Sequence, residues 1–135
     1  LFAAPLELVA GTAALAETFW LGSWGGTIIA GLLVRFLGGP LGWHPHPDLI
    51  HQADICGSVG SWACAGALNV LFARQPAWVV WPARIGAGIY LGYQLAAVHG
   101  AADVAHPIGF LIGSGIGAWQ VRRQGYHPAR SRLGG

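Results

Sequence analysis

The sequence predicts an all-α membrane protein, a polytopic helical bundle with about five transmembrane helices. Only 9% of the 135 residues are charged and 54% are hydrophobic, whereas a soluble domain carries about 25% charged residues. The chain also has 22 glycines and 7 tryptophans. That combination is typical of membrane bundles, in which glycine permits close helix contact and tryptophan lies at the membrane interface. The small formal net charge of +2 argues against nucleic-acid binding.

Five apolar segments follow one another along the chain, each close to the roughly 20 residues that cross a bilayer. In order they are 2–21, 24–41, 55–73, 77–98 and 104–121. The glycine-rich stretch "LGSWGG", 21–26, predicts a tight turn between the first two. A long loop rich in proline and histidine, 38–54, precedes the third. We therefore expect one transmembrane domain over 1–121, followed by a basic cytoplasmic tail over 122–135.

The arginines predict how the bundle is oriented. If five helices alternate in direction, only Arg35 lies on one side of the membrane. The other six share the opposite side with the C-terminal tail: Arg74, Arg84, Arg122, Arg123, Arg130 and Arg132. By the positive-inside rule, the C-terminus then faces the cytoplasm. We expect an integral membrane protein of the bacterial plasma membrane, with the lipid bilayer as one partner.

One serine and one histidine are the main candidates for chemistry. Ser58 and His106 each lie about one turn inside the outer end of their segment, and so at similar depth. A serine hydroxyl is a weak nucleophile unless a base takes its proton, which histidine can do. Trp62 follows Ser58 by four residues and shares its helix face, where it would orient the imidazole. Ser61 is a rival, but Ala65 stands four residues after it, so Ser61 lacks the aromatic neighbour.

Small residues predict that the two helices bearing these side chains approach closely. Glycines at four-residue spacing form a stripe that allows helix backbones to meet. The histidine segment carries such a stripe, and glycines also mark the serine segment: Gly109, Gly113 and Gly117 on the first, and Gly57, Gly60 and Gly66 on the second. Close packing of these faces would bring the serine and the histidine within hydrogen-bond reach.

These motifs resemble the rhomboid family of intramembrane serine proteases. That family has a serine in a Gly-x-Ser-Gly motif, an aromatic residue at Ser+4 and a glycine at Ser+8, a spacing that Ser58, Trp62 and Gly66 fit. Its last core helix reads Ala-His-x-x-Gly-x-x-x-Gly, matched by Ala105, His106, Gly109 and Gly113. A weaker match is "AETFWLGS", 16–23, which looks like the family's acid followed by Leu-Gly-Ser. The resemblance covers nearly all of the chain.

The resemblance implies an intramembrane serine endopeptidase that cleaves transmembrane protein substrates with a Ser58–His106 dyad. The backbone N–H groups of Gly57 and Ser58 would hold the oxyanion, and Trp62 would orient the histidine. Three glycines would serve helix packing: Gly66, Gly109 and Gly113. No metal or cofactor is required.

Two other interpretations stay open. A rhomboid-like pseudoprotease would bind transmembrane helices without cutting them. Its support is that Cys56 and Val59 stand where the family has glycines, and that the family's His-x-x-x-Asn motif is absent near 2–6. A haem- or metal-binding membrane protein would use His99 and His106. Loop residues of metal-binding type are expected to be solvated: His44, His46, Asp48, His51 and Asp54.

Overall fold

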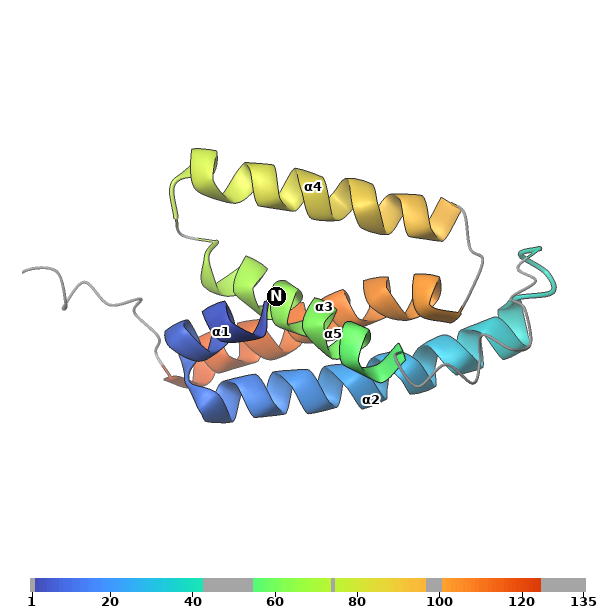
Figure 1. The fold of residues 1–135 in the computed structure, drawn as a ribbon, viewed down its shortest axis with the longest axis horizontal. Coiled ribbons are helices and arrows are strands. Elements are labelled where there is room, and N and C mark those ends of the chain that lie inside the picture. The colour runs from blue at the N-terminus through green and yellow to red at the C-terminus, as the bar shows by residue number, and fades with distance from the viewer. Residues whose placement is uncertain (1, 43–54, 74, 97–100, 125–135) are drawn as a thin grey trace, which may run out of the picture.

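The computed structural model describes residues 2–42, 55–73, 75–96 and 101–124 (Figure 1). Every regular element in these ranges is an α-helix, which confirms the predicted all-α class. The helices are α1 (Ala3–Ala10), α2 (Thr12–Leu37), α3 (Ile55–Leu71), α4 (Ala77–Ala96) and α5 (Ala101–Gln124).

Helices α2, α3 and α5 pack against one another and form the centre of the bundle. The short helix α1 folds back over α3, and α4 lies along one side, where it packs on α5 and runs antiparallel to it (Figure 1). The end of α2 and the starts of α3 and α5 all lie at one end of the bundle. The first two turns of α3 and α5, which carry Ser58 and His106, belong to that end.

The predicted tight turn over 21–26 is wrong, because α2 continues through it without interruption. The glycines there serve helix contact instead. A methyl group on Gly26 would lie 2.5 Å from Val59 Cγ1, and one on Gly22 would overlap the Ala63 side chain. Helical glycines with a close neighbour are tolerated because they let two backbones approach. The stretch therefore marks the face of α2 that meets α3.

The real break in the first predicted segment lies at Gly11. Its φ of 88° is a left-handed conformation that glycine adopts without steric cost. The segment 2–21 therefore divides into α1 and the first part of α2, and Thr12 Oγ1 donates a hydrogen bond to Glu7 Oε1 (2.8 Å) across the break. The other three segments are helical with small shifts of their ends. Helix α5 continues to Gln124, so the first residues of the predicted tail belong to it.

One described helix, α2, is long and apolar enough to cross a membrane, with a mean hydropathy of 1.3 in its most apolar stretch. Large apolar side chains also lie exposed on the outer faces of the bundle. They include Trp20, Trp24, Ile28 and Phe36 on α2, Trp78, Ile85, Ile89 and Tyr93 on α4, and Leu111 and Trp119 on α5. Exposed apolar surface on this scale marks a face that meets another apolar phase or a partner.

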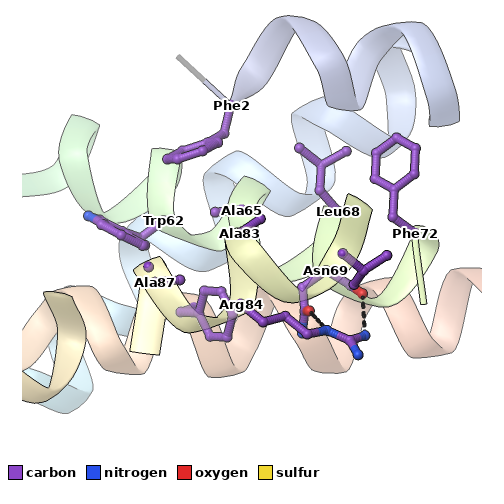
Figure 2. Close-up of a pocket in the computed structure, with 12 residues that line it drawn as sticks. Phe2, Trp62, Ala65, Leu68, Asn69, Phe72, Ala83, Arg84 and Ala87 are labelled. Atoms are coloured by element: carbon purple, nitrogen blue, oxygen red, sulfur yellow. Dashed lines mark hydrogen bonds between the residues drawn. The ribbon is translucent and has the colours of Figure 1, made fainter. Parts of the chain in front are cut away.

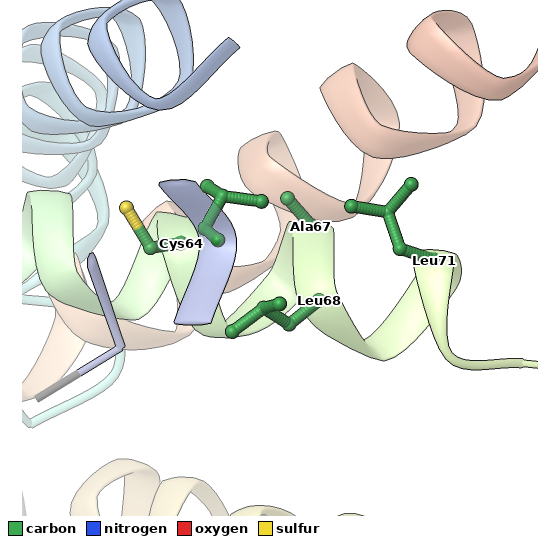
Figure 3. Packing of buried hydrophobic residues seen from close by; sticks show 5 residues of the cluster. Cys64, Ala67, Leu68 and Leu71 are labelled. Atoms are coloured by element: carbon green, nitrogen blue, oxygen red, sulfur yellow. The ribbon is translucent and has the colours of Figure 1, made fainter. Parts of the chain in front are cut away.

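A cluster of buried side chains holds α1 against the second half of α3 (Figure 3). Leu6 of α1 is fully buried against Cys64 and Leu68. Ala67 and Leu71 complete the cluster on α3. Helix α1 therefore covers the part of α3 that lies away from Ser58.

A polar contact ties α4 to α3 near the opposite end of the bundle from Ser58. Arg84 Nε donates to Asn69 Oδ1 (2.7 Å), and Arg84 Nη2 donates to the Asn69 carbonyl oxygen (3.3 Å), as Figure 2 shows. The guanidinium also lies 5.8 Å from the centroid of the Trp81 ring. Asn69 is thus the residue of α3 to which this part of α4 is hydrogen-bonded.

We expect Asn69→Leu to destabilise the folded chain by about 1.5–3 kcal/mol, because a hydrogen bond to a charged group is lost. Thermal unfolding of the purified protein in one detergent measures the change. Asn69→Asp is the matched control, since a carboxylate keeps an acceptor for the guanidinium. Equal unfolding temperatures for the two variants would show that the contact does not contribute to stability.

Candidate active site

The structure brings Ser58 and His106 together at one end of the bundle. Ser58 lies in the first turn of α3 and His106 in the second turn of α5. Ser58 Oγ and His106 Nε2 are 2.9 Å apart, which is within hydrogen-bond range. The histidine is only 8% exposed. This distance allows the hydroxyl to donate to Nε2 when that nitrogen carries no proton, which is the geometry that a nucleophile and base pair requires.

Backbone contact between α3 and α5 sets this distance. A methyl group on Gly109 would lie 2.7 Å from the Val59 carbonyl oxygen, and one on Gly113 would overlap the Ala63 carbonyl oxygen. On the facing helix, a methyl group on Gly66 would overlap the Phe110 carbonyl oxygen. The three glycines that the sequence assigned to packing therefore lie where the two backbones meet.

Val59, next to Ser58, points away from the dyad. Its side chain is fully buried and its Cγ1 lies against Gly26 of α2 and Gly109 of α5. It packs in a second cluster with Ala30, Val104 and Ala105. A valine at this position therefore fills the space between α2, α3 and α5.

The two serines of α3 have different partners. Ser61 Oγ donates to the Gly57 carbonyl oxygen in its own helix (3.1 Å). Ser58 Oγ is bonded to His106 of another helix. The contacts therefore separate the two candidates in the way that the sequence spacing predicts.

Trp62 lies beside the imidazole but stacks on a different ring. Its ring centroid is 6.1 Å from that of His106, with 36° between the planes. It stacks nearly parallel on Tyr90 of α4, at 5.1 Å and 11°. Trp62 thus packs against both His106 of the dyad and Tyr90 of α4, and its parallel partner is a residue that sequence reasoning did not select.

The N-terminal end of α3 supplies the backbone of the site. Gly57 and Ser58 lie in the first turn, where the N–H groups that precede that of Ser58 have no acceptor within the helix. The N-terminal end also carries partial positive charge, which favours an anion. Gly57 is exposed, and no described residue lies within 4 Å of the position that a methyl group on it would occupy. A developing oxyanion would have room beside it.

Sequence reasoning missed Gln94, a residue of α4 that contacts the other nitrogen of the histidine. Its side-chain Nε2 and Oε1 lie 2.9 and 3.1 Å from His106 Nδ1. Nε2 also donates toward Tyr90 Oη (3.1 Å) and Asp103 Oδ1 (3.4 Å). Asp103, in the first turn of α5, thus belongs to the same polar network. A signal was available, because Gln94 is a polar amide in the second half of a mostly apolar segment.

A cavity of about 540 Å³ extends from Trp62 along the space between α3 and α4 (Figure 2). Apolar side chains line most of it, among them Phe2, Leu68, Phe72 and Phe110, and Arg84 and Asn69 are its polar members. Trp62 lines this cavity and also lies beside His106, so the cavity is adjacent to the dyad.

Some predicted residues lie outside the described part of the chain. These are the side chain of Cys56, all of His99, and the loop residues His44, His46, Asp48, His51 and Asp54. Comparisons with models of protein families, with curated proteins and with solved structures find no match for this chain.

Proposed function

We propose that this chain is an intramembrane serine endopeptidase with a rhomboid-like core, which cleaves transmembrane protein substrates. The observation that carries the proposal is the 2.9 Å contact between Ser58 Oγ and His106 Nε2. The two residues come from helices whose glycine faces meet backbone to backbone. That rigid contact favours a fixed nucleophile and base pair over an incidental polar contact.

The distribution of apolar side chains supports a polytopic membrane bundle. The exposed faces of α2 and α4 carry tryptophan, isoleucine, leucine and phenylalanine. Trp78 and Trp81 are exposed at the start of α4, and Trp119 is exposed near the end of α5, where Arg123 lies 4.4 Å from its ring centroid. Aromatic and arginine side chains at one end of a bundle are typical of a membrane interface.

The length of α3 supports access of water to Ser58. Its 17 residues span about 26 Å at 1.5 Å each, less than the roughly 30 Å of a hydrocarbon core. A helix of this length can leave its first turn below the outer surface of the bilayer. A hydrolase in a membrane needs such a recess, because the second half of its reaction consumes water.

In the first half of the reaction, Ser58 Oγ attacks the carbonyl carbon of the scissile peptide bond as His106 Nε2 takes the hydroxyl proton. The carbonyl oxygen becomes an oxyanion near the N–H groups of Gly57 and Ser58. The tetrahedral intermediate collapses as the C–N bond breaks, and the leaving amine takes the proton from Nε2. The product is an ester between Ser58 and the substrate carbonyl.

In the second half, a water molecule attacks the ester carbon while His106 Nε2 accepts one of its protons. The C–Oγ bond then breaks, and Ser58 recovers its proton from the imidazole. The substrate leaves as a carboxylic acid, and no atom beyond those of water is required. The apolar cavity beside Trp62 offers a surface for an apolar stretch of the substrate.

Mapping a covalent adduct tests the proposal. The purified chain is treated in detergent with a fluorophosphonate, digested, and analysed by peptide mass spectrometry. We expect phosphonylation of Ser58 and none of Ser61, because only Ser58 has a base on its hydroxyl. Labelling in Ser61→Ala should match the parent chain, and labelling in Ser58→Ala should be absent.

A folded chain without an adduct at Ser58 would contradict the protease proposal. The pseudoprotease interpretation would then gain support, and it predicts capture of a transmembrane helix without cleavage. An adduct at Ser61 would instead show that the nucleophile had been assigned to the wrong serine.

A further inference from the structure

We propose that Gln94 is a positioning residue, which holds the His106 imidazole with its proton on Nδ1. The Gln94 oxygen accepts the hydrogen bond from Nδ1, and the Gln94 nitrogen donates a hydrogen bond to Asp103. The catalytic part of this inference rests on the proposed function, since a base needs an unprotonated Nε2 facing Ser58. The part that concerns the imidazole does not depend on catalysis. It follows from the hydrogen-bond partners of one buried amide.

Counting donors and acceptors around Gln94 favours one orientation of its amide. The amide is 7% exposed and has two N–H hydrogens and one acceptor oxygen. Two oxygen acceptors, Tyr90 Oη and Asp103 Oδ1, lie 3.1 and 3.4 Å from Gln94 Nε2. If these two take the hydrogens, Oε1 is left to accept from His106 Nδ1, which lies 3.1 Å from it. His106 must then carry its proton on Nδ1.

The other tautomer leaves the network incomplete. An unprotonated Nδ1 would accept one N–H from Gln94, since Nε2 lies 2.9 Å away. Gln94 Oε1, which belongs to a buried side chain, would then receive no hydrogen from the imidazole. Buried polar atoms are rarely left in that state. The remaining imidazole nitrogen would also carry hydrogen toward Ser58 and could not act as a base.

This arrangement extends the dyad into a chain of four groups from three helices. Ser58 Oγ meets His106 Nε2, His106 Nδ1 meets Gln94, and Gln94 meets Asp103. Asp103 stands three residues before His106 on α5, so both side chains lie on one face. When Nε2 takes the serine proton, the imidazolium charge falls next to the amide oxygen, with the carboxylate beyond it. Tyr90 is the titratable group that faces the network from α4.

Nitrogen NMR of histidine-labelled protein in detergent tests the inference directly. The imidazole ¹⁵N shifts distinguish the two tautomers, and His106→Ala identifies the resonances. We expect His106 as the Nδ1–H form in the parent chain, and a mixture of both forms in Gln94→Leu. Gln94→Glu combined with Asp103→Asn should keep the Nδ1–H form, because a carboxylate accepts from Nδ1 and an amide now donates to it.

The rate of fluorophosphonate labelling supplies the functional readout. We expect Gln94→Leu to lower it by about 10- to 100-fold, as part of what a positioned base provides, and the double variant to recover most of the loss. Asp103→Asn should shift the acid side of the pH–rate profile to lower pH, because a negative charge near the imidazolium is removed. Gln120→Leu is the control, since that buried glutamine bonds the Ala14 carbonyl of α2 instead.

The Nε2–H form in the parent chain would overturn the inference, as would an unchanged His106 signal in a folded Gln94→Leu. Because the parent chain alone decides the tautomer, a variant that fails to fold does not remove the test. Absence of any adduct at Ser58 would refute the protease proposal and still leave the tautomer measurement decisive.

Discussion

His106→Ala is expected to lower the rate at which a fluorophosphonate labels Ser58 by about 10²- to 10⁴-fold, the usual contribution of a positioned general base. The physical reason is that His106 Nε2 is the imidazole nitrogen placed 2.9 Å from the Ser58 hydroxyl. Without it the hydroxyl keeps its proton and attacks slowly. The measurement is the second-order rate constant of labelling, with circular dichroism and gel filtration to confirm that the variant is folded.

His106→Gln is the informative control for this prediction. A glutamine can hydrogen-bond the serine but cannot take its proton at neutral pH. We expect labelling as slow as in His106→Ala. A rate near that of the parent chain would show that histidine serves only as a hydrogen-bond partner and would end the base assignment.

Gly113→Ala is expected to destabilise the folded bundle by about 1–3 kcal/mol or more, the cost of forcing extra volume into a close-packed contact. A methyl group there would overlap the Ala63 backbone carbonyl of α3, which cannot rotate away as a flexible side chain does. Relief requires that α3 and α5 separate, which also moves Ser58 away from His106. The unfolding temperature in detergent and the labelling rate should therefore fall together.

Gly115→Ala is the matched control two residues along the same helix. Among the residues that the structure describes, none lies within 4 Å of the position of its methyl group, and alanine favours a helix over glycine by up to about 1 kcal/mol. We expect equal or slightly higher stability and an unchanged labelling rate. If both variants unfold at the same temperature, the backbone contact at Gly113 is not a determinant of the fold.

The sequence predicts the centre of this molecule well. Glycines at four-residue spacing on α5 mark the face that meets α3, and Gly66 lies opposite them. The other two glycines predicted to mark this face of α3 do not meet α5: Gly60 faces Ser23 and Phe19 of α2, and no described residue lies within 4 Å of a methyl group on Gly57. Once that stripe is fixed, the depth of Ser58 and of His106 follows from counting turns. Local spacing therefore suffices for the pair, without knowledge of the other helices.

Features that depend on a third helix were not predictable in the same way. Glycines in "LGSWGG" are compatible with a turn or with a helix contact, and only the presence of Val59 and Ala63 opposite them decides for the contact. Gln94 is similar, because its role depends on how far α4 lies from α5. The sequence marks it as polar in an apolar segment, but it does not state which side chain the amide meets.

The side helix α4 carries a thermodynamic consequence. Side-chain contacts join it to the rest of the bundle. Arg84 donates a hydrogen bond to Asn69, and Tyr90 stacks on Trp62. Gln94 is hydrogen-bonded to His106. If the inference about Gln94 holds, docking of α4 and correct protonation of the imidazole are linked equilibria. A lipid or peptide that binds better when α4 is displaced then lowers the fraction of molecules in which His106 is correctly protonated. The size of this effect is set by the ratio of its affinities for the displaced and the docked state. Inhibition would need no contact with the serine.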